Sequence, residues 1–511
     1  MLRLKAAIAF AGVLLLLWYW LAEQRPALRP GGRLRDALLL TLGVIACASW
    51  WNLGRFHFGS SILHYREMFH YYLGAKYAPE LGYTRLYECS FVAEAEFAHL
   101  GARLVPLKIR DLATNQVGFG APVLEHPGNC KQHFSPERWQ AFMRDSNYFW
   151  EGASWERWPN VFLDHGYNAT PAWRVFGGFL ANRIQEANDA SLGRLTLLDP
   201  LLLATMMGAV AWAFGWRTLC VALLFFGTNY PGRFWWTGGG FLRTDWLAAT
   251  VCSICLLRRD RPFGAGLLSG FAAMMRIFPA LFAAALCLKV LVASVRARRL
   301  TWTPSQRRFL AGALVAVAAL LGLSVRDGGI DAWRGFVANS SKHLGTPLTN
   351  NMGLKTVLAY RPSTRLEVAR DDTSADSFER WKQLQLENFH ARRWLFVAGL
   401  LAFLVLLSAA VELHGDWVAL VLGAGLVIIA TQLTCYYAAG FIAFALLWKT
   451  LPWTGWALAL LSFMTCVAAL GLPDTDSLYV LLSAAYVVFA VIVTAALARR
   501  RLDAPAEVIP E

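Results

Sequence analysis

Apolar residues in this chain gather into long blocks instead of alternating with polar residues. A helix of about 20 apolar residues crosses a hydrocarbon core of roughly 30 Å. The pattern therefore predicts an all-α polytopic membrane protein with a bundle of about 11–13 transmembrane helices. The blocks fall at 6–22, 37–53, 197–214, 217–230, 241–257, 263–275, 277–293, 309–325, 393–412, 417–434, 436–450, 454–471 and 477–498.

Two places in this pattern have alternatives. Arg3 and Lys5 precede the first block as in a signal peptide, but no small-x-small cleavage site follows, so we expect a helix. The blocks 263–275 and 277–293 are two half-helices or one long kinked helix, since Arg276 and Pro279 separate them. We favour separate helices, because merging them moves a basic loop to the opposite side.

Two long polar segments interrupt the apolar blocks. Neither has low complexity, and both carry aromatic residues, so we expect folded outer loops. The predicted organisation is N-terminal helices 1–53, a first outer loop 54–195, central helices 196–325, a second outer loop 326–392, C-terminal helices 393–498 and a cytoplasmic tail 499–511.

Composition and charge sharpen this interpretation. Residues are 57% hydrophobic and 16% charged, whereas a soluble protein averages about 25% charged. The net charge of +14 sits in short loops, while segment 54–195 balances 14 basic against 14 acidic residues. This positive-inside pattern predicts a plasma (inner) membrane protein with its N-terminus outside and its C-terminus inside. It indicates the lipid bilayer as partner and disfavours nucleic acid. The basic loops contain Arg25/Arg29/Arg33/Arg35, Arg258/Arg259/Arg261, Arg296/Arg298/Arg299/Arg307/Arg308 and Arg499/Arg500/Arg501.

The nine cysteines form no framework by their spacing. Seven lie in or beside apolar blocks, as packing residues do. Cys89 and Cys130 share the first outer loop, and can pair if that loop faces an oxidising compartment.

The segment His64–Tyr87 is the strongest candidate for chemistry. It follows an apolar helix and carries Glu67, His70 and the pair Tyr71-Tyr72. A carboxylate at the edge of the bilayer can act as general base toward an acceptor hydroxyl. The alternative is a solvated Glu67 that pairs with Arg66 or His70.

The same region has helical periodicity. Residues 66–100 predict an amphipathic helix at the membrane surface. One face of this helix carries Met68, Tyr71, Tyr72 and Ala75, and the other faces carry Arg66, His70 and Lys76.

These motifs resemble the first outer loop of GT-C glycosyltransferases, above all the polyprenyl-phosphate-mannose-dependent branch. That branch has Asp-Phe-x-x-Tyr-Tyr, where this chain has Glu67-Met68-Phe69-His70-Tyr71-Tyr72 and then Gly82-Tyr83-Thr84-Arg85-Leu86-Tyr87. The resemblance implies a GT-C-type bundle in which Glu67 is the catalytic base, with His70 as its nearest competitor. The extra N-terminal helix and the very long first loop depart from the family pattern.

Three further segments resemble the family in order and spacing. They are the basic-x-x-Pro segment Arg276–Pro279, the outer-loop segment Asn350-Asn351-Met352-Gly353-Leu354, and the aromatic pair Tyr436-Tyr437. Together with Tyr71 and Tyr72, Asn350 and Asn351 are candidates for donor or acceptor binding.

A lipid-phosphate donor requires basic residues, since guanidinium binds phosphate oxygens in a bidentate manner. Arg243 has a structural alternative, a pair with Asp245. Asp164 and His165 are candidates for the acceptor site, or simply a turn, and Gly238-Gly239-Gly240 suits a lipid chain or a close helix approach. The donor-phosphate candidates are Arg243, Arg276, Lys342, His343 and Arg361.

The resulting prediction is a membrane hexosyltransferase acting on the outer face. It takes a sugar such as mannose from a polyprenyl-phosphate donor to a glycan, lipid or protein acceptor, with no metal and no other cofactor. The alternatives are a transporter or flippase of a polar lipid or solute, and an O-antigen ligase or polymerase. A transporter predicts symmetric halves and charges at mid-membrane; a ligase predicts its large loop late in the chain.

Overall fold

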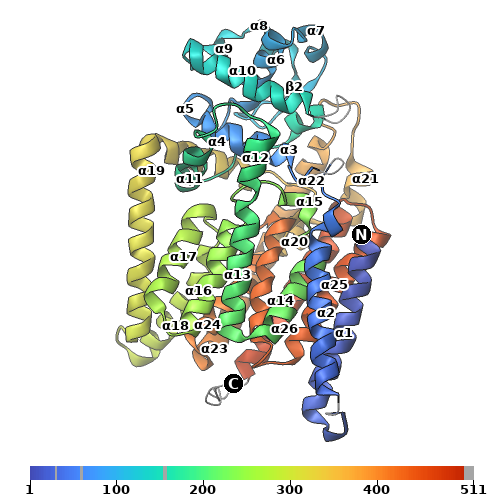
Figure 1. Cartoon of the computed structure of the whole chain (residues 1–511), viewed down its shortest axis with the longest axis vertical. Helices are drawn as coiled ribbons and strands as arrows, with labels where there is room; N and C mark the ends of the chain where they lie inside the picture. Colours follow the sequence, from blue (N-terminus) through green and yellow to red (C-terminus); the bar gives the residue numbers. More distant parts are fainter. Residues whose placement is uncertain (29–30, 58–60, 153–157, 500–511) are drawn as a thin grey trace.

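The computed structural model describes residues 1–28, 31–57, 61–152 and 158–499. These residues are mostly helical, as the sequence predicted. A tall bundle of helices carries a smaller group of short helices and strands at one end (Figure 1). The predicted tail lies outside the described residues from residue 500 onward.

Each apolar block forms a helix of the bundle. The spacing of apolar residues thus identified the elements, with boundaries shifted by a few residues except at the end of α19. The helices are α1 (Leu2–Gln24), α2 (Gly32–Trp50), α13 (Leu198–Phe214), α14 (Trp216–Thr228), α16 (Asp245–Arg258), α17 (Pro262–Arg276), α18 (Ala280–Ala297), α19 (Pro304–Leu344), α23 (Arg393–Leu413), α24 (Asp416–Ala430), the 3₁₀ helix η6 (Cys435–Leu447), α25 (Trp453–Gly471) and α26 (Asp476–Arg499).

In the described parts of the chain, seven helical stretches are long and apolar enough to cross a membrane, fewer than the blocks suggested. They are α1, α18, α19, α23, α25, α26 and the stretch Asp189–Phe214, which joins α13 to α12 (Asp189–Thr196). Three more apolar helices, α14, α24 and η6, have 10–17 residues. Residues Val418–Ile429 of α24 are buried throughout, so neighbouring helices rather than lipid surround that helix.

The blocks 263–275 and 277–293 form separate helices. α17 ends where Ile277 adopts φ 59°, and Pro279 precedes the first residue of α18. Proline has no N–H for a preceding turn, which favours a helix start here.

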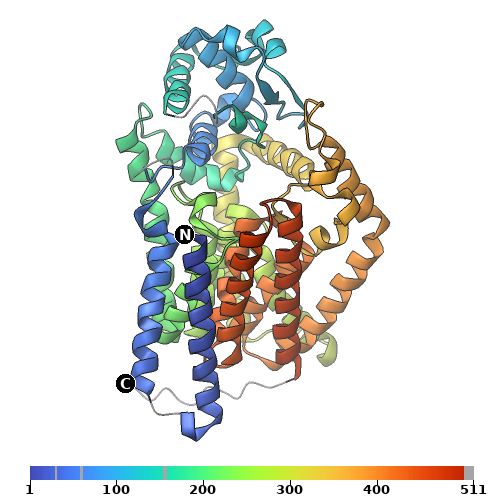
Figure 2. The same cartoon turned by 90° about the vertical axis from the view of Figure 1, so that its right-hand side faces the viewer.

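The basic loops meet at one end of the bundle. Arg259 donates to the carbonyl of Trp212, the Arg258 guanidinium lies 5.5 Å from the ring of Trp417, and Arg296 pairs with Glu412. These contacts join four inter-helix connections, while the short helices gather at the opposite end (Figure 2).

The first polar segment forms a domain on top of the bundle, which we call the cap domain (residues 61–195). It has its own core, rich in buried aromatic side chains. A disulfide between Cys89 and Cys130 joins α6 to α9. Besides α12, the elements are α3 (Tyr65–Met68), the π-helical turn η3 (Phe69–Leu73), α4 (Gly74–Lys76), α5 (Ala78–Leu81), α6 (Leu86–Phe97), α7 (Gly101–Leu104), β1 (Lys108–Arg110), β2 (Val117–Phe119), α8 (Ala121–Glu125), α9 (Gly128–Lys131), α10 (Pro136–Glu151), the 3₁₀ turn η4 (Trp158–Leu163) and α11 (Pro171–Ala181).

The prediction of one amphipathic helix over 66–100 was wrong. Pro79 opens α5, and Gly82 ends it with φ 54°, so the stretch breaks into short helices. His70 and Lys76, predicted on faces other than that of Tyr72, are buried together with Tyr72. Because the domain packs on several sides of this segment, periodicity did not reveal its exposed face.

The second polar segment begins inside a helix that continues from the bundle. α19 runs past residue 325 to Leu344 and changes direction at Gly329, whose φ of 69° a glycine adopts without strain. The part beyond the bend lies across the upper end of the bundle (Figure 2). The elements that follow are β3 (Asn351–Met352), α20 (Leu354–Ala359), the turn η5 (Pro362–Thr364), α21 (Leu366–Ala369) and α22 (Glu379–Ala391).

Two small sheets accompany the helices. β1 pairs antiparallel with β2 in the cap domain, and β3 pairs antiparallel with β4 (Leu433–Thr434) beside the bundle. The second pair ties the loop after α19 to the start of η6. Short connecting elements are η1 (Pro26–Leu28), η2 (Asn52–Gly54) and α15 (Phe234–Thr237).

Candidate active site

A cavity of about 1030 Å³ lies between the cap domain and the upper end of the bundle. The cap domain, the loop 235–243, the segment 347–350 and the start of η6 all contribute to its wall. Of the residues predicted from sequence, it brings together Glu67, His70, Tyr71, Asp164, His165, Arg243 and Asn350.

The glycine triplet allows two wall segments to approach closely. The His64 N–H donates to the carbonyl of Gly239 (3.0 Å), and a Cβ on Gly239 would lie 1.8 Å from the Ile62 carbonyl oxygen. A Cβ on Gly240 would lie 3.3 Å from Cβ of Glu67. The triplet therefore permits a close backbone approach, and this approach positions Glu67.

A buried aspartate fixes the loop that presents Arg243. Asp199, in the first turn of α13, accepts hydrogen bonds from the backbone N–H groups of Arg243 (2.9 Å) and Thr244 (2.8 Å). The Thr244 hydroxyl donates to the same carboxylate at 2.6 Å. The sequence did not predict this role of Asp199, because a single acidic residue is common in the first turn of any helix.

Glu67 and Arg243 form an ion pair at the cavity wall. Their Oε2 and Nε atoms are 2.5 Å apart, and the side chains are 14% and 2% exposed. The guanidinium lies 3.9 Å from the centre of the Tyr71 ring, and its Nη2 donates to the Tyr436 hydroxyl at 3.5 Å. Burial raises the pKa of Glu67, while the positive charge of Arg243 acts in the opposite direction. A raised pKa makes this carboxylate a better proton acceptor.

Two alternative pairings, Glu67 with Arg66 and Arg243 with Asp245, are excluded by this geometry. Arg66, instead of pairing with Glu67, donates to the carbonyl of Asn160 (2.9 Å) and lies 3.8 Å from Asp164. Asp245 accepts from the N–H of Trp246 (2.7 Å), while Arg243 pairs with Glu67.

His70 is held by neighbours inside the wall. Its Nε2 lies 2.7 Å from the Tyr87 hydroxyl, which also accepts from the N–H of Gly166 (3.0 Å). The direction of the contact between the Tyr87 hydroxyl and His70 depends on which ring nitrogen carries the proton. Burial lowers the pKa of His70 to about 4. These contacts favour a positioning role over that of a base.

Asp164 and His165 lie on the cap side of the cavity. Burial alone would raise the pKa of Asp164, but the positive charge of Arg66, followed by His70, lowers it well below its usual range. His165 Nδ1 lies 2.9 Å from Oδ1 of Asn115, and its ring is 5.4 Å from that of His343. Asp164 is therefore a second carboxylate charge facing the cavity.

Asn350 and Asn351 lie where the two parts of the wall join. The Asn350 carbonyl accepts from the N–H of Cys435 (2.9 Å), and Asn351 pairs with Thr434 across the small sheet. Asn350 lines the cavity, whereas Asn351 is buried in the sheet.

Arg276 stands behind the wall. Its guanidinium is 5.4 Å from the Tyr71 ring centre, and its Nη2 donates to the carbonyl of Leu242 at 3.3 Å. Trp173 donates to the same carbonyl at 3.0 Å. Arg276 thus supports the Arg243 loop from outside the cavity lining.

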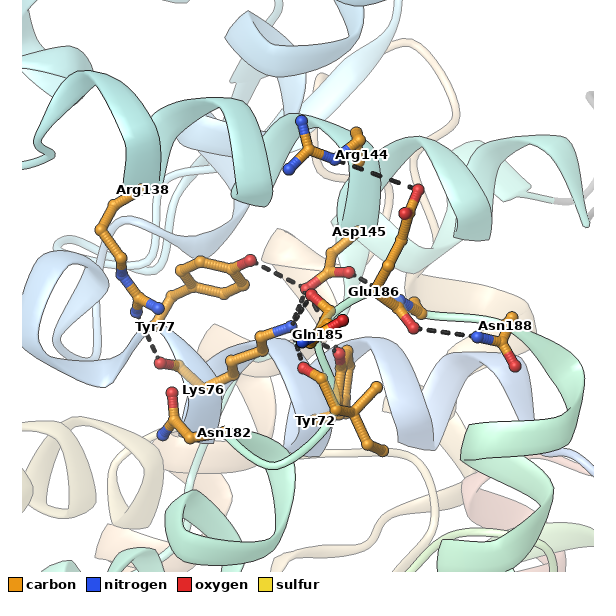
Figure 3. Close-up of polar contacts among 12 residues, drawn as sticks. Tyr72, Lys76, Tyr77, Arg138, Arg144, Asp145, Asn182, Gln185, Glu186 and Asn188 are labelled. Carbon is orange, nitrogen blue, oxygen red and sulfur yellow. Dashed lines mark hydrogen bonds and ion pairs between the residues drawn. The ribbon is translucent and has the colours of Figure 1, made fainter.

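The remaining predicted residues lie elsewhere. Tyr72 belongs to a buried polar network in the cap domain (Figure 3). Lys342 donates to the carbonyl of Leu112 and lines a second cavity, and Arg361 is an exposed residue ahead of η5. Spacing along the chain gave no indication of these positions, because each depends on how the two outer segments pack.

Several cavity residues were missed from sequence. Arg110 and Lys382 reach Asp376 from the cap domain and from α22, at 3.5 and 2.5 Å. The sequence also contains Asp474-Thr475-Asp476, an Asp-x-Asp spacing. Asp474 lines the cavity and pairs with Arg233 at 2.8 Å, while Asp476 accepts from the Trp381 indole at 2.8 Å. In the described part of the chain, no group of three or more His, Cys, Asp or Glu residues is placed to hold a metal ion.

Comparison of the chain with protein-family models, with curated proteins and with solved structures gives no match. What the site can do therefore rests on its geometry. A carboxylate with a raised pKa and a buried guanidinium face one cavity, which suits proton removal beside an anionic group.

Proposed function

We propose that this chain is a polytopic membrane glycosyltransferase of GT-C type. It transfers a hexose such as mannose from a polyprenyl-phosphate donor to an acceptor on the outer face of the plasma membrane. The observation that carries the proposal is the Glu67–Arg243 pair, held by two distant chain segments at one cavity wall above an apolar bundle.

In this proposal Glu67 acts as the base. An acceptor hydroxyl gives its proton to the carboxylate while the hydroxyl oxygen attacks the anomeric carbon of the donor sugar. The new glycosidic C–O bond forms as the bond from that carbon to the phosphate oxygen breaks. The electron pair leaves with the phosphate, so polyprenyl phosphate is the second product and the displacement inverts the anomeric configuration.

Arg243 suits the leaving phosphate. Its Nη1 is buried with no hydrogen-bond partner among the described residues, so a donor remains available. The rings of Tyr71 and Tyr436 flank the guanidinium and limit its orientations. Fixed positive charge beside a developing anion stabilises the transition state.

The membrane orientation rests on charge and on the disulfide. Basic loops gather at the end of the bundle opposite the cap domain, which is the cytoplasmic end by the positive-inside rule. The Cys89–Cys130 disulfide suits an oxidising compartment on the cap side.

The test uses purified protein in proteoliposomes with radiolabelled polyprenyl-phosphate mannose and a membrane lipid and glycan fraction as acceptor pool. We expect label transfer that Glu67→Gln lowers by about 10²–10⁴-fold, because proton removal is lost. Glu80→Gln is the matched control, since Glu80 pairs with Arg138 in the cap domain at 2.6 Å.

Transfer by Glu67→Gln at the wild-type rate would remove Glu67 as the base. Solute uptake into the vesicles without any labelled product would favour the transporter alternative.

A further inference from the structure

A second cavity, of about 700 Å³, lies between the cap domain and the part of α19 beyond Gly329. The cap domain contributes Tyr83, Thr84 and Tyr167, and α19 contributes residues between Asp327 and Lys342. The mechanism above does not use this cavity.

Its lining combines aromatic rings with mixed polar groups. The rings of Tyr83 and Tyr167 stack with centroids 5.7 Å apart, and both line the cavity. Arg174 pairs with Asp327 at 3.0 Å, and Thr84 and Thr114 add hydroxyl groups. Aromatic rings pack against the C–H faces of sugars, while groups that both donate and accept suit many hydroxyls. This chemistry favours a glycan over a purely apolar or purely anionic ligand.

The helix beneath the cavity carries an apolar stripe on its other side. Ile330, Val337 and Leu344 recur every seven residues and are 53%, 58% and 66% exposed. Gly335, which lines the cavity, lies five residues from Ile330, or about 140° around the helix. The stripe therefore faces away from the cap domain.

The stripe continues the exposed apolar surface of the first part of α19, where Leu314, Val315 and Leu321 are also exposed. A helix with one apolar face and one polar face lies in the membrane interface. The second cavity is thus at the level of the lipid head groups.

A hydrogen bond links the lining of the second cavity to the lining of the first. Asn339 lines the second cavity and donates from Nδ2 to Oδ1 of Asn168, which lines the first, at 2.9 Å. A ligand that spans both cavities would replace this amide pair.

We propose that the second cavity binds the glycan head group of a lipid-anchored acceptor whose hydrocarbon chain stays in the bilayer beside α19. The glycan then extends past Asn168 and presents its hydroxyl to Glu67. This inference rests on the proposed function for the reaction, but the binding itself requires no transfer.

The test places p-benzoylphenylalanine at Ala338, which lines the cavity, or at its neighbour Val337, which lies on the apolar stripe. Both substitutions are made in full-length Glu67→Gln protein in native membranes, and adducts formed on illumination are identified by mass spectrometry. We expect adducts that carry both sugar and a hydrocarbon chain at position 338, and phospholipid adducts at 337. Identical phospholipid adducts at both positions, or water-soluble glycans alone at 338, would overturn the proposal.

A second measurement compares Ala338→Trp with Val337→Trp in the transfer assay. We expect Ala338→Trp to lower kcat/KM for the lipid-anchored acceptor by about tenfold, because the indole fills the cavity. Hydrolysis of the donor by water should continue, which a misfolded variant would not support, and Val337→Trp should match wild type. Unchanged kcat/KM in Ala338→Trp would exclude the cavity as the acceptor site. Absence of transfer by the wild-type protein would instead refute the proposed function. The adducts at position 338 would then decide whether the cavity binds the glycan.

Discussion

The protein contains two buried pairs of a carboxylate and a basic side chain, each beside tyrosines, and the two pairs have different hydrogen-bond surroundings. In the cap domain, Lys76 and Asp145 are 2.7 Å apart with side chains 5% and 0% exposed. At the cavity, Arg243 and Glu67 are 2.5 Å apart and nearly as buried. The pairs differ in what else contacts their polar atoms.

The cap pair is fully satisfied. Asp145 accepts from Tyr77 (2.8 Å) and Tyr72 (3.2 Å) through Oδ2, and from the N–H of Ala187 (2.7 Å) through Oδ1. The Lys76 ammonium also donates to the carbonyl of Ile184 at 2.7 Å (Figure 3). Such saturation stabilises a fold and leaves no group for a ligand.

The cavity pair is incompletely satisfied. Arg243 Nη1 is buried without a hydrogen-bond partner among the described residues. A buried unpaired donor is costly unless a ligand satisfies it. The contrast indicates that the Lys76–Asp145 pair is structural and that the Arg243–Glu67 pair can bind an anion.

The strongest test of this contrast exchanges each cation for methionine. Lys76→Met should lower the free energy of unfolding by about 3–5 kcal/mol, since Asp145 keeps its burial but loses its charge partner. Arg243→Met should cost less stability, because Glu67, with its raised pKa, can take up a proton. Thermal unfolding in detergent measures both, and equal losses would contradict the distinction.

The second test keeps the charge and changes its shape. Arg243→Lys should lower kcat/KM for the donor by roughly tenfold to a hundredfold, because an ammonium loses bidentate phosphate binding and the flat contact with Tyr71. Arg138→Lys is the matched control, as Arg138 also pairs with a glutamate but lies in the cap domain. Similar activity losses in both variants would show that the effect is not specific to the cavity.

The bundle was predictable because a helix in or near lipid must hide its backbone polar groups within itself. Long apolar blocks therefore become helices whatever their neighbours are. The length of α19 was not predictable in this way, since residues beyond 325 are polar on one side and continue the helix after the bend at Gly329.

The site could be predicted only in part. Local motifs pointed to Glu67 and Tyr71, and the need for a basic residue at the donor phosphate pointed to Arg243. Their contact depends on Gly239 and on Asp199, whose roles appear only when distant segments pack. Tyr72 follows Tyr71 in the motif, yet its ring joins the Asp145 network.

The third test is the pH dependence of transfer. Since burial raises the pKa of Glu67, the acidic limb of kcat/KM should lie above the ordinary range of a glutamate. The charge of Asp164 adds to this rise, so Asp164→Asn should move the limb to lower pH. Transfer rates measured across the acidic pH range test this prediction. An acidic limb at the same pH in Asp164→Asn and wild type would show that the charge of Asp164 does not affect the pKa of Glu67.

The last test asks whether the buried polar groups of the cap domain are satisfied throughout. Glu94, in α6, is 2% exposed, and burial, together with the charge of Glu151, raises its pKa from 4.5 to about 7. A carboxyl whose pKa is higher in the folded state loses stability as pH rises from 4.5 to 7, by about 3 kcal/mol at most. Glu94→Gln cannot lose a proton, so its unfolding temperature should fall less between pH 5 and about 8 than that of wild type. If the unfolding temperature falls equally in the two proteins, the pH-sensitive group is not Glu94. The cap domain would then resemble the Lys76–Asp145 pair, with its buried polar groups satisfied.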